Sequence, residues 1–297
     1  MKSKFSWVAL TMFCVGLLAL FFAALLFTGE NPEFLDSSDK LAVIEVVGPI
    51  FDSKDICQQL DRVYQDDRIK GLILRIDSPG GAVGPSQEIY DAVLRLKTKK
   101  KVIVSMGSVA ASGGYYIAVA ADKIVANPGT ITGSIGVLMD HMNVEELLKF
   151  LKVDMEVLKA GALKDIGSPV RTMTPEEKDF LHSILNNMHG QFKEAVKKGR
   201  GLTQQQIDTL ADGRVFTGEQ ALELGLIDKL GSQQAAVDLA QEMLHIKGTP
   251  KLLYPKKEKP KLMDLLAEGN VEATFLKMFY TMREGRALYL TKGIRYE

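Results

Sequence analysis

The chain has 297 residues, of which 46% are hydrophobic and 25% charged, so it can bury a sizeable core in one large domain or two small ones. Basic and acidic residues number 37 each, and this balance gives no electrostatic reason to expect a nucleic-acid partner. The two cysteines, Cys14 and Cys57, are too few for a disulfide framework or a metal-ligand cluster, and no motif marks Cys57 as a nucleophile.

The first predicted element is an uncharged run of 23 residues, Phe5 to Phe27. At about 1.5 Å per residue it covers the ~30 Å hydrocarbon layer of a bilayer. Lys2 and Lys4 precede it and acidic residues follow it, so the positive-inside rule places the N-terminus in the cytoplasm and the rest outside. The alternative is a cleaved signal peptide, whose apolar region is shorter and ends at a small-residue site. We expect residues 1–27 to be a cytoplasmic start and a retained anchor.

Residues 28–40 are polar and read as a linker, after which an α/β pattern begins. Apolar strands alternate with helical periodicity, which predicts parallel pairing through right-handed crossovers, with helices on both faces of the sheet. The predicted strands are Leu41–Val47, Gly71–Ile76 and Val102–Met106, and the predicted helices between them lie near Lys54–Tyr64 and Ser86–Leu96.

Helices dominate after Met173. A capping box with proline at the first helical position, Thr174-Pro175-Glu176-Glu177, starts a helix predicted to run to about Lys198 and to stop at Gly199. Shorter helical patterns follow at Thr203–Leu210, Gly218–Leu224 and Ser232–Leu244.

The composition changes after residue 247, where we place the end of the folded domain. Residues 251–261 carry five lysines and two prolines and predict a solvated, extended linker. The last 35 residues are weakly amphipathic. They fit a docking tail, a membrane-surface helix or a poorly ordered end, and a tail folded back over the cleft is one hypothesis.

Two segments combine small residues with chemistry-bearing groups at strand ends. Asp77-Ser78-Pro79-Gly80-Gly81 follows a predicted strand, and its glycines permit a tight turn with exposed N–H groups that can stabilise an oxyanion. The segment Gly107 to Tyr116 places Ser112 between small residues before an apolar helix, which suits a nucleophile. An ordinary turn and simple helix capping explain the same residues without function.

A nucleophilic serine needs an adjacent base. Of the four histidines, His182 and His189 share one helix face and His245 ends a helix, which leaves His141 as the candidate for a triad. A lysine is the other possibility, but it must be buried to be neutral near pH 7, since its ordinary pKa is about 10.4. Composition singles out no lysine.

Five motifs in order resemble those of SppA-type signal peptide peptidases of the short form, from about Leu41 to Leu244. They are Asp77–Gly81, Gly107–Gly114, Thr132–Gly136, Lys159–Asp165 and Ala211–Gly218.

The resemblance implies a ClpP/crotonase-like fold of repeated β-β-α and βαβ units over residues 41–247, followed by a C-terminal extension over 248–297. It also implies a Ser–Lys dyad, with Ser112 as nucleophile and Lys164 as general base. Ser134 resembles the serine that orients the lysine. The N–H groups of Gly113 and of Gly80 or Gly81 resemble the oxyanion hole. Related triad enzymes carry a histidine where this chain has Thr132–Gly136, which disfavours His141.

The resemblance further implies a serine endopeptidase that degrades signal peptides left in the membrane after preprotein processing. It would act as a ring- or dome-shaped homo-oligomer on the extracytoplasmic side of the cell's inner membrane, and it implies no metal and no cofactor. Two alternatives from other classes are a non-catalytic membrane scaffold and a crotonase-like acyl-CoA enzyme.

Overall fold

The computed structural model describes Val15, residues 39–254 and residues 288–290. The predicted anchor, Phe5 to Phe27, and most of the following linker therefore lie outside the described residues, and a separate compact unit begins at Asp39. None of the helices described reaches the length and apolar character that a membrane crossing demands.

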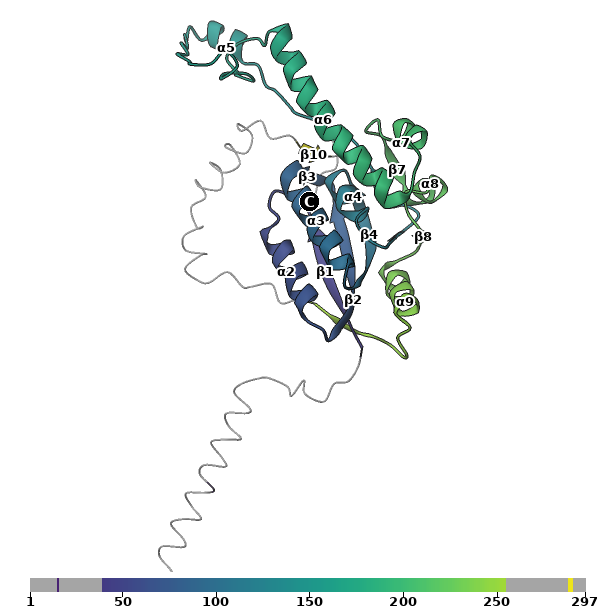
Figure 1. Ribbon diagram of the computed structural model, residues 1–297. Coiled ribbons are helices and arrows are strands. Elements are labelled where there is room, and N and C mark those ends of the chain that lie inside the picture. Colours follow the sequence, from purple (N-terminus) through teal and green to yellow (C-terminus); the bar gives the residue numbers. More distant parts are fainter. Residues whose placement is uncertain (1–14, 16–38, 255–287, 291–297) are drawn as a thin grey trace, which may run out of the picture. The chain divides into compact units, whose positions relative to one another are not determined.

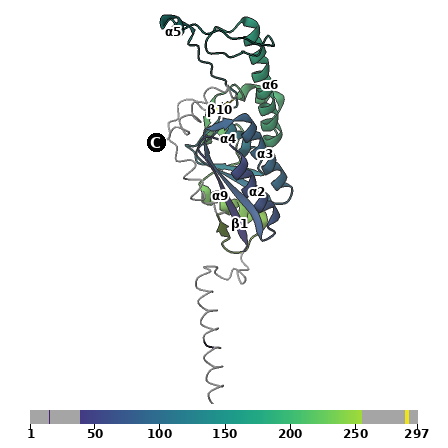
Figure 2. The same ribbon diagram turned by 90° about the vertical axis from the view of Figure 1, so that its left-hand side faces the viewer.

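A mostly parallel sheet forms the centre of this unit (Figures 1 and 2). Its middle consists of β1 (Lys40–Val47), β2 (Ile69–Ser78) and β4 (Lys101–Ala111), which confirms the three strands predicted from apolar runs. The other strands of the sheet are β5 (Lys123–Ala126), β6 (Ile131–Gly133), β7 (Val215–Thr217), β8 (Lys229–Leu230) and β9 (Lys251–Leu253). The order is β7-β6-β4-β2-β1-β9, with β5 beside β4 and β8 beside β5. Among the described strands of this sheet, β6 and β7 pair antiparallel and the others pair in parallel.

Helices cover both faces of the sheet, as the unbroken apolar strands predict. On one face lie α2 (Lys54–Gln65), α3 (Val83–Lys97) and α4 (Gly113–Ala118); on the other lies α9 (Gln233–Leu244). Successive residues of β1 alternate between the faces: Ala42 and Ile44 join the cluster under α2 and α3, whereas Leu41 and Val43 join the cluster under α9. The architecture is therefore a layered α/β fold.

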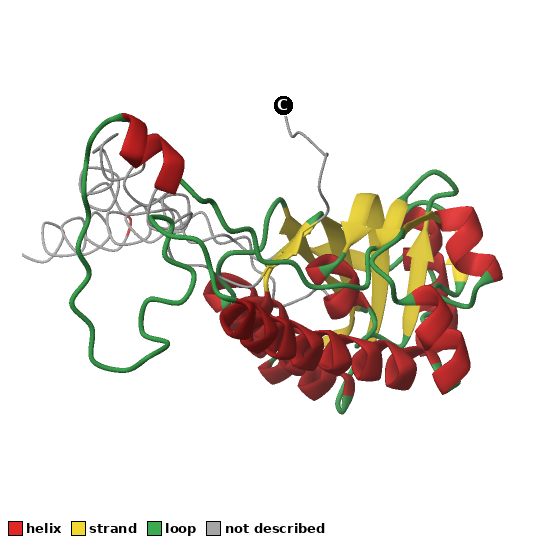
Figure 3. Cartoon of the chain, turned by 90° about the horizontal axis from the view of Figure 1, so that it is seen from above, coloured by secondary structure: helices red, strands yellow, loops and turns green. Residues whose placement is uncertain are grey.

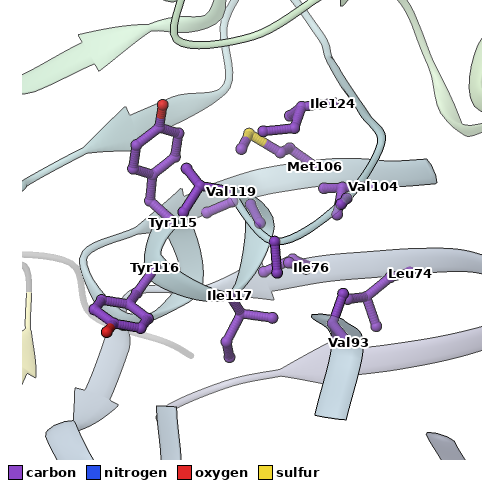
Figure 4. Packing of buried hydrophobic residues seen from close by; sticks show 14 of the residues in the cluster. Leu74, Ile76, Val93, Val104, Met106, Tyr115, Tyr116, Ile117, Val119 and Ile124 are labelled. Carbon is purple, nitrogen blue, oxygen red and sulfur yellow. The ribbon is translucent and has the colours of Figure 1, made fainter. Parts of the chain in front are cut away.

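The short helix α4 is held by its burial (Figure 4). All six of its residues are buried, and Tyr115 and Ile117 are fully inaccessible among Ile76 of β2 and Met106 of β4. Full burial of each such side chain contributes about 1.5–3 kcal/mol. The packing fixes the position of the turn that precedes α4, which contains Ser112.

The long helix α6 (Pro175–Arg200) begins at the predicted capping box, in which Thr174 and Glu177 exchange hydrogen bonds. Its end differs from the prediction, because the chain remains helical through Gly199 and stops at Gly201, which has φ 65°. Gly199 has another role: a Cβ there would lie 2.2 Å from Val119 O. The glycine lets α6 pack closely against the backbone that follows α4.

Three shorter helices complete the unit. These are α5 (Glu145–Phe150), α7 (Gln204–Leu210) and α8 (Gly218–Glu223), the last two starting at further capping boxes. Seen from above, α5 and the irregular segment 151–173 lie apart from the strands, toward the N-terminal end of α6 (Figure 3). We call residues 142–173 the arm.

The C-terminal side also differs from the prediction. Residues 251–253, expected to be part of a solvated linker, form β9 and pair in parallel with β1, because Leu252 and Leu253 pack against the two clusters of the core. The folded part of the chain thus extends six residues beyond the predicted boundary at 247. Near the C-terminus, β10 (Leu288–Leu290) pairs antiparallel with β3 (Gly80–Ala82).

Candidate active site

Ser112 lies at the turn from β4 into α4, and its backbone is unusual. It has φ 53° and ψ −119°, outside the region that a non-glycine residue ordinarily adopts, at a cost of about 1–3 kcal/mol. Its N–H donates to Gly133 O at 2.8 Å, which fixes the turn. Such a strained strand-to-helix turn is the geometry that presents a nucleophilic serine.

The Ser112 hydroxyl is buried and has no hydrogen-bond partner among the described residues. The residue is only 1% exposed. A buried hydroxyl without a partner costs about 1–3 kcal/mol, so native proteins rarely keep one without a functional reason.

The two glycines of the Ser-Pro-Gly-Gly motif differ in what their N–H groups do. Gly80 N–H donates to Ser78 Oγ at 3.1 Å and is engaged. Gly80 O and Ala82 N–H both bond to Ile50, so strand alternation turns Gly81 N–H to the opposite edge. That edge is where β10 lies, with Tyr289 opposite Gly81.

Gly113, the residue after Ser112, lies close to Gly81. A Cβ built on Gly113 would lie 3.1 Å from Gly81 N and 2.5 Å from Ser86 Oγ, so the two backbones approach as closely as a glycine allows. Gly113 and Gly81 are therefore neighbours beside Ser112, although 32 residues separate them in sequence. The arrangement can stabilise an oxyanion formed at the Ser112 turn.

Ser134 is held beside the same turn. It follows Gly133, whose carbonyl accepts from Ser112, and like Ser112 it has φ 53°. Its N–H donates to Arg214 O at 2.8 Å, and the carbonyl of the next residue, Ile135, lies 3.1 Å from His189 Nε2. Ser134 is 8% exposed. The fold thus brings Ser112, Ser134, Gly81 and Gly113 together from three motifs.

Three groups that hold this site were not singled out from sequence. Asp77 Oδ1 accepts from Val109 N at 3.1 Å, at the irregularity between β2 and β4. The Arg214 carbonyl belongs to the Ala211–Gly218 motif, whose role the sequence did not reveal. His189, which the sequence placed only on a helix face shared with His182, is half-buried on α6.

Lys164 is exposed in the single chain, whereas Ser112 is buried. The lysine lies on a turn of the arm, where its N–H donates to Gly161 O at 3.1 Å. Within the described part of the chain its ammonium has neither a hydrogen-bond nor an ion-pair partner. A neutral base requires a buried lysine, and within the single chain no residue of the arm is buried. The Ser112–Lys164 dyad stays a prediction.

An ion cluster surrounds the Lys164 turn. The Asp165 carboxylate binds both Lys159 Nζ and Arg171 Nε, the latter at 2.8 Å. Arg171 also forms a fork with Glu177, at 2.8 and 2.5 Å. Hydrogen bonds from Arg171 and Lys159 hold the pKa of Asp165 well below its usual range, and those from Arg171 and the Thr174 N–H lower the pKa of Glu177 to about 2.

The alternative nucleophile and base fit less well. Cys57 lies on α2 beside a cavity of about 470 Å³ between α2 and α3, remote in the sheet order from β6, and burial raises the pKa of its thiol, which disfavours the reactive thiolate. His141 is exposed, immediately before the arm. Residues 39–254 contain no group of three or more side chains suited to hold a metal ion.

The chain matches the family described as Peptidase family S49 over residues 95–247 and the Clp protease family over residues 35–130. It is 46% identical to a protein named "Putative protease" from Synechocystis sp., over 66% of this chain and 72% of that one. Identity is 32% to a "Putative protease" of Methanocaldococcus jannaschii, over 87% and 89% of the two chains. It is 33% to a "Putative signal peptide peptidase SppA" of Enterococcus faecium, over 75% and 69%.

Proposed function

The chain belongs to peptidase family S49, of the SppA type, with a Clp protease-like domain, and from this premise we propose that it is a membrane-anchored serine endopeptidase. Ser112 is the nucleophile and Lys164 the general base. Ser134 orients the lysine, and the N–H groups of Gly113 and Gly81 form the oxyanion hole. Gly81 is preferred to Gly80 because the Gly80 N–H is already donated to Ser78.

The observation that carries the proposal is the Ser112 turn. A non-glycine residue with positive φ, buried, with an unpartnered hydroxyl and two glycine backbones beside it, supports acyl transfer better than a structural cap. Helix capping, the bland alternative, finds no support, since the Ser112 side chain makes no capping hydrogen bond to α4.

The base must come from another copy of the chain. A single chain leaves Lys164 in solvent, whereas a neutral lysine needs burial. The arm that contains it exposes apolar side chains in a number that a monomer rarely tolerates. Those exposed by 42% or more are Met142, Leu147, Phe150, Leu151, Val153, Met155, Val157, Leu158 and Leu163.

Packing of this arm on a neighbouring copy would bury both the apolar surface and Lys164. A head-to-tail contact of this kind forms a ring when the rotation between successive copies closes, which is the geometry of the proposed ring- or dome-shaped homo-oligomer. The lysine of one copy then completes the site of the next.

The reaction proposed is acyl transfer. Neutral Lys164 accepts the Ser112 proton as Oγ attacks the peptide carbonyl, and the Gly113 and Gly81 N–H groups stabilise the oxyanion. The protonated lysine donates to the leaving amine when the C–N bond breaks. The lysine then deprotonates a water molecule, which attacks the acyl carbonyl; as the bond to Ser112 Oγ breaks, the protonated lysine returns its proton to Oγ and the serine is regenerated. The residues named account for every proton transferred.

The substrates proposed are signal peptides left in the membrane after preprotein processing. An extended apolar peptide can add to the β3 edge, which accepts the strand Leu288–Leu290 in this chain. The anchor over residues 5–27 would hold the catalytic domain on the extracytoplasmic side of the inner membrane, where such peptides are reached. No metal or cofactor takes part, so EDTA should leave activity unchanged.

The test is peptide cleavage by the full chain in detergent. Ser112→Ala and Lys164→Ala should each abolish cleavage and leave the fold intact, and a fluorophosphonate should label Ser112. Randomly mixed oligomers of the two variants distinguish the source of the base. If the dyad forms between copies, about a quarter of the sites pair an intact serine with an intact lysine and activity returns.

A dyad within one chain predicts no recovery on mixing. Full activity of Lys164→Ala would reject the dyad. Acyl-CoA turnover without labelling of Ser112 would favour a crotonase-like enzyme, and a folded oligomer without any cleavage would favour a scaffold.

A further inference from the structure

The turn that contains Lys164 is held in place by ion pairs rather than by packing of buried apolar side chains. Lys159 and Arg171 both hold the Asp165 carboxylate, and Arg171 joins it to Glu177 in the first turn of α6. Glu177 also accepts from Thr174 N at 2.9 Å and is 4% exposed, so one end of the cluster is anchored at a buried carboxylate of the α6 capping box. The turn is thereby fixed to a long helix.

Stability alone does not account for so many charges on an irregular loop. Exposed ion pairs contribute little to folding, and the arm has few buried residues to which they could add. Asp165, however, directly follows Lys164. A carboxylate beside an ammonium favours the protonated form, which is the wrong form for a general base.

We propose that Arg171 is a positioning residue for the general base: by holding Asp165 and Glu177 together, it keeps the neighbouring carboxylate away from Lys164 Nζ and fixes the turn that presents it. The inference rests on the proposed dyad. The charged groups at this turn are Lys159, Asp165, Arg171 and Glu177. Two further carboxylates of the segment are held separately: Glu145 by Lys149 and Thr172, and Glu146 by Lys149.

The experiment measures kcat/KM against pH for the full-chain oligomer. Arg171→Gln leaves Asp165 with one cation and frees it to pair with Lys164. The acid limb of the profile should move up by about one pH unit, since a nearby opposite charge shifts a pKa by 1–3 units. Activity near neutral pH should fall about tenfold and return at alkaline pH.

Three further variants make the result specific. Asp165→Asn combined with Arg171→Gln removes the competing carboxylate and should bring the acid limb back. Arg171→Lys keeps the positive charge but not the two-pronged hydrogen bonds of the guanidinium, so it should shift the acid limb in the same direction by a smaller amount. This variant keeps the proposal testable if Arg171→Gln does not fold. Arg95→Gln breaks the exposed pair with Asp61 elsewhere and should leave the profile unchanged.

Two outcomes would overturn the inference: an acid limb that Arg171→Gln leaves at its wild-type pH, or a loss that is equal at every pH and not recovered with Asp165→Asn. If Lys164→Ala is inactive in the same assay, the dyad survives either outcome and only the role of Arg171 is lost. Full activity of Lys164→Ala would instead remove the dyad itself.

Discussion

Replacement of Gly113 by alanine should impair catalysis without unfolding the protein. Gly113 is the first residue of α4 and has no positive φ, so alanine adds no backbone strain there. Its Cβ would lie 3.1 Å from Gly81 N, 3.3 Å from Gly80 Cα and 2.5 Å from Ser86 Oγ. The first two contacts are to backbone and cannot be relieved by a rotamer change. The proposed oxyanion donors must therefore move apart.

The size of the effect follows from that displacement. Loss of one oxyanion donor lowers kcat by about 10²–10³-fold, whereas overpacking of this kind costs about 1–3 kcal/mol of stability. We expect kcat to fall at least about 10²-fold, with KM changed much less, because the donors act on charge that develops in the transition state. Peptide cleavage under saturating substrate measures the first quantity and thermal unfolding the second.

Two controls distinguish displacement of the oxyanion donors from a general effect of adding a methyl group. Gly84→Ala, in the first turn of α3, adds a Cβ with no neighbour within 4 Å and should leave kcat unchanged. Ser86→Ala combined with Gly113→Ala removes the closest contact but leaves the one to Gly81, so most of the loss should persist. A Gly113→Ala enzyme with kcat within about twofold of wild type would refute this account of the oxyanion hole.

The remaining predictions concern stability and the tail. Gly199→Ala in α6 places a Cβ 2.2 Å from Val119 O and should lower the free energy of unfolding by about 1–3 kcal/mol, measured by chemical denaturation. Gly190→Ala in the same helix meets nothing within 4 Å and should raise it by about 0.5–1 kcal/mol. Equal effects of the two variants would contradict the close packing at Gly199. Burial raises the pKa of Asp228, but the hydrogen bond and charge of Arg200 outweigh burial and leave the pKa below its usual value. The ionised carboxylate therefore stabilises the fold above pH ~4, and this contribution is lost as the pH falls through the folded-state pKa. Asp228→Asn should lower the free energy of unfolding by about 2–3 kcal/mol at neutral pH and flatten the acid side of the stability profile. Deletion of residues 255–297 keeps β9 but removes the strand on β3, and should lower KM for extended peptides; unchanged KM would show that β10 does not compete with substrate.

Local signals in the sequence were sufficient for most of the fold. The unbroken apolar runs of β1, β2 and β4 require burial on both faces, and the Thr174 capping box fixes where α6 begins. The end of α6 and the strand β9 were predicted wrongly for one reason. Whether Gly199 terminates a helix or admits a neighbouring backbone, and whether Leu252 is solvated or paired with β1, depends on elements distant in sequence.

The candidate site likewise contains some residues that the sequence suggests and others that only the tertiary structure reveals. Ser112, Gly80 and Gly81 are candidates from the sequence because they lie among small residues at strand ends, whereas Ser134 was assigned only through the resemblance of the ordered motifs to the family. Only the tertiary structure distinguishes Gly81 from Gly80, since the distinction is the direction of one N–H group. It alone reveals Asp77, His189 and the Arg214 carbonyl as supports.

The amino-acid sequence by itself was sufficient to predict most of the helices and strands, the family, and Ser112 as a candidate nucleophile, because periodicity, helix caps and ordered motifs depend on residue types alone. The tertiary structure decided which backbone groups converge on Ser112 and left Lys164 exposed on an apolar arm. A lysine acts as a base only where water is excluded, and exclusion of water is a property of packed surfaces rather than of any local motif.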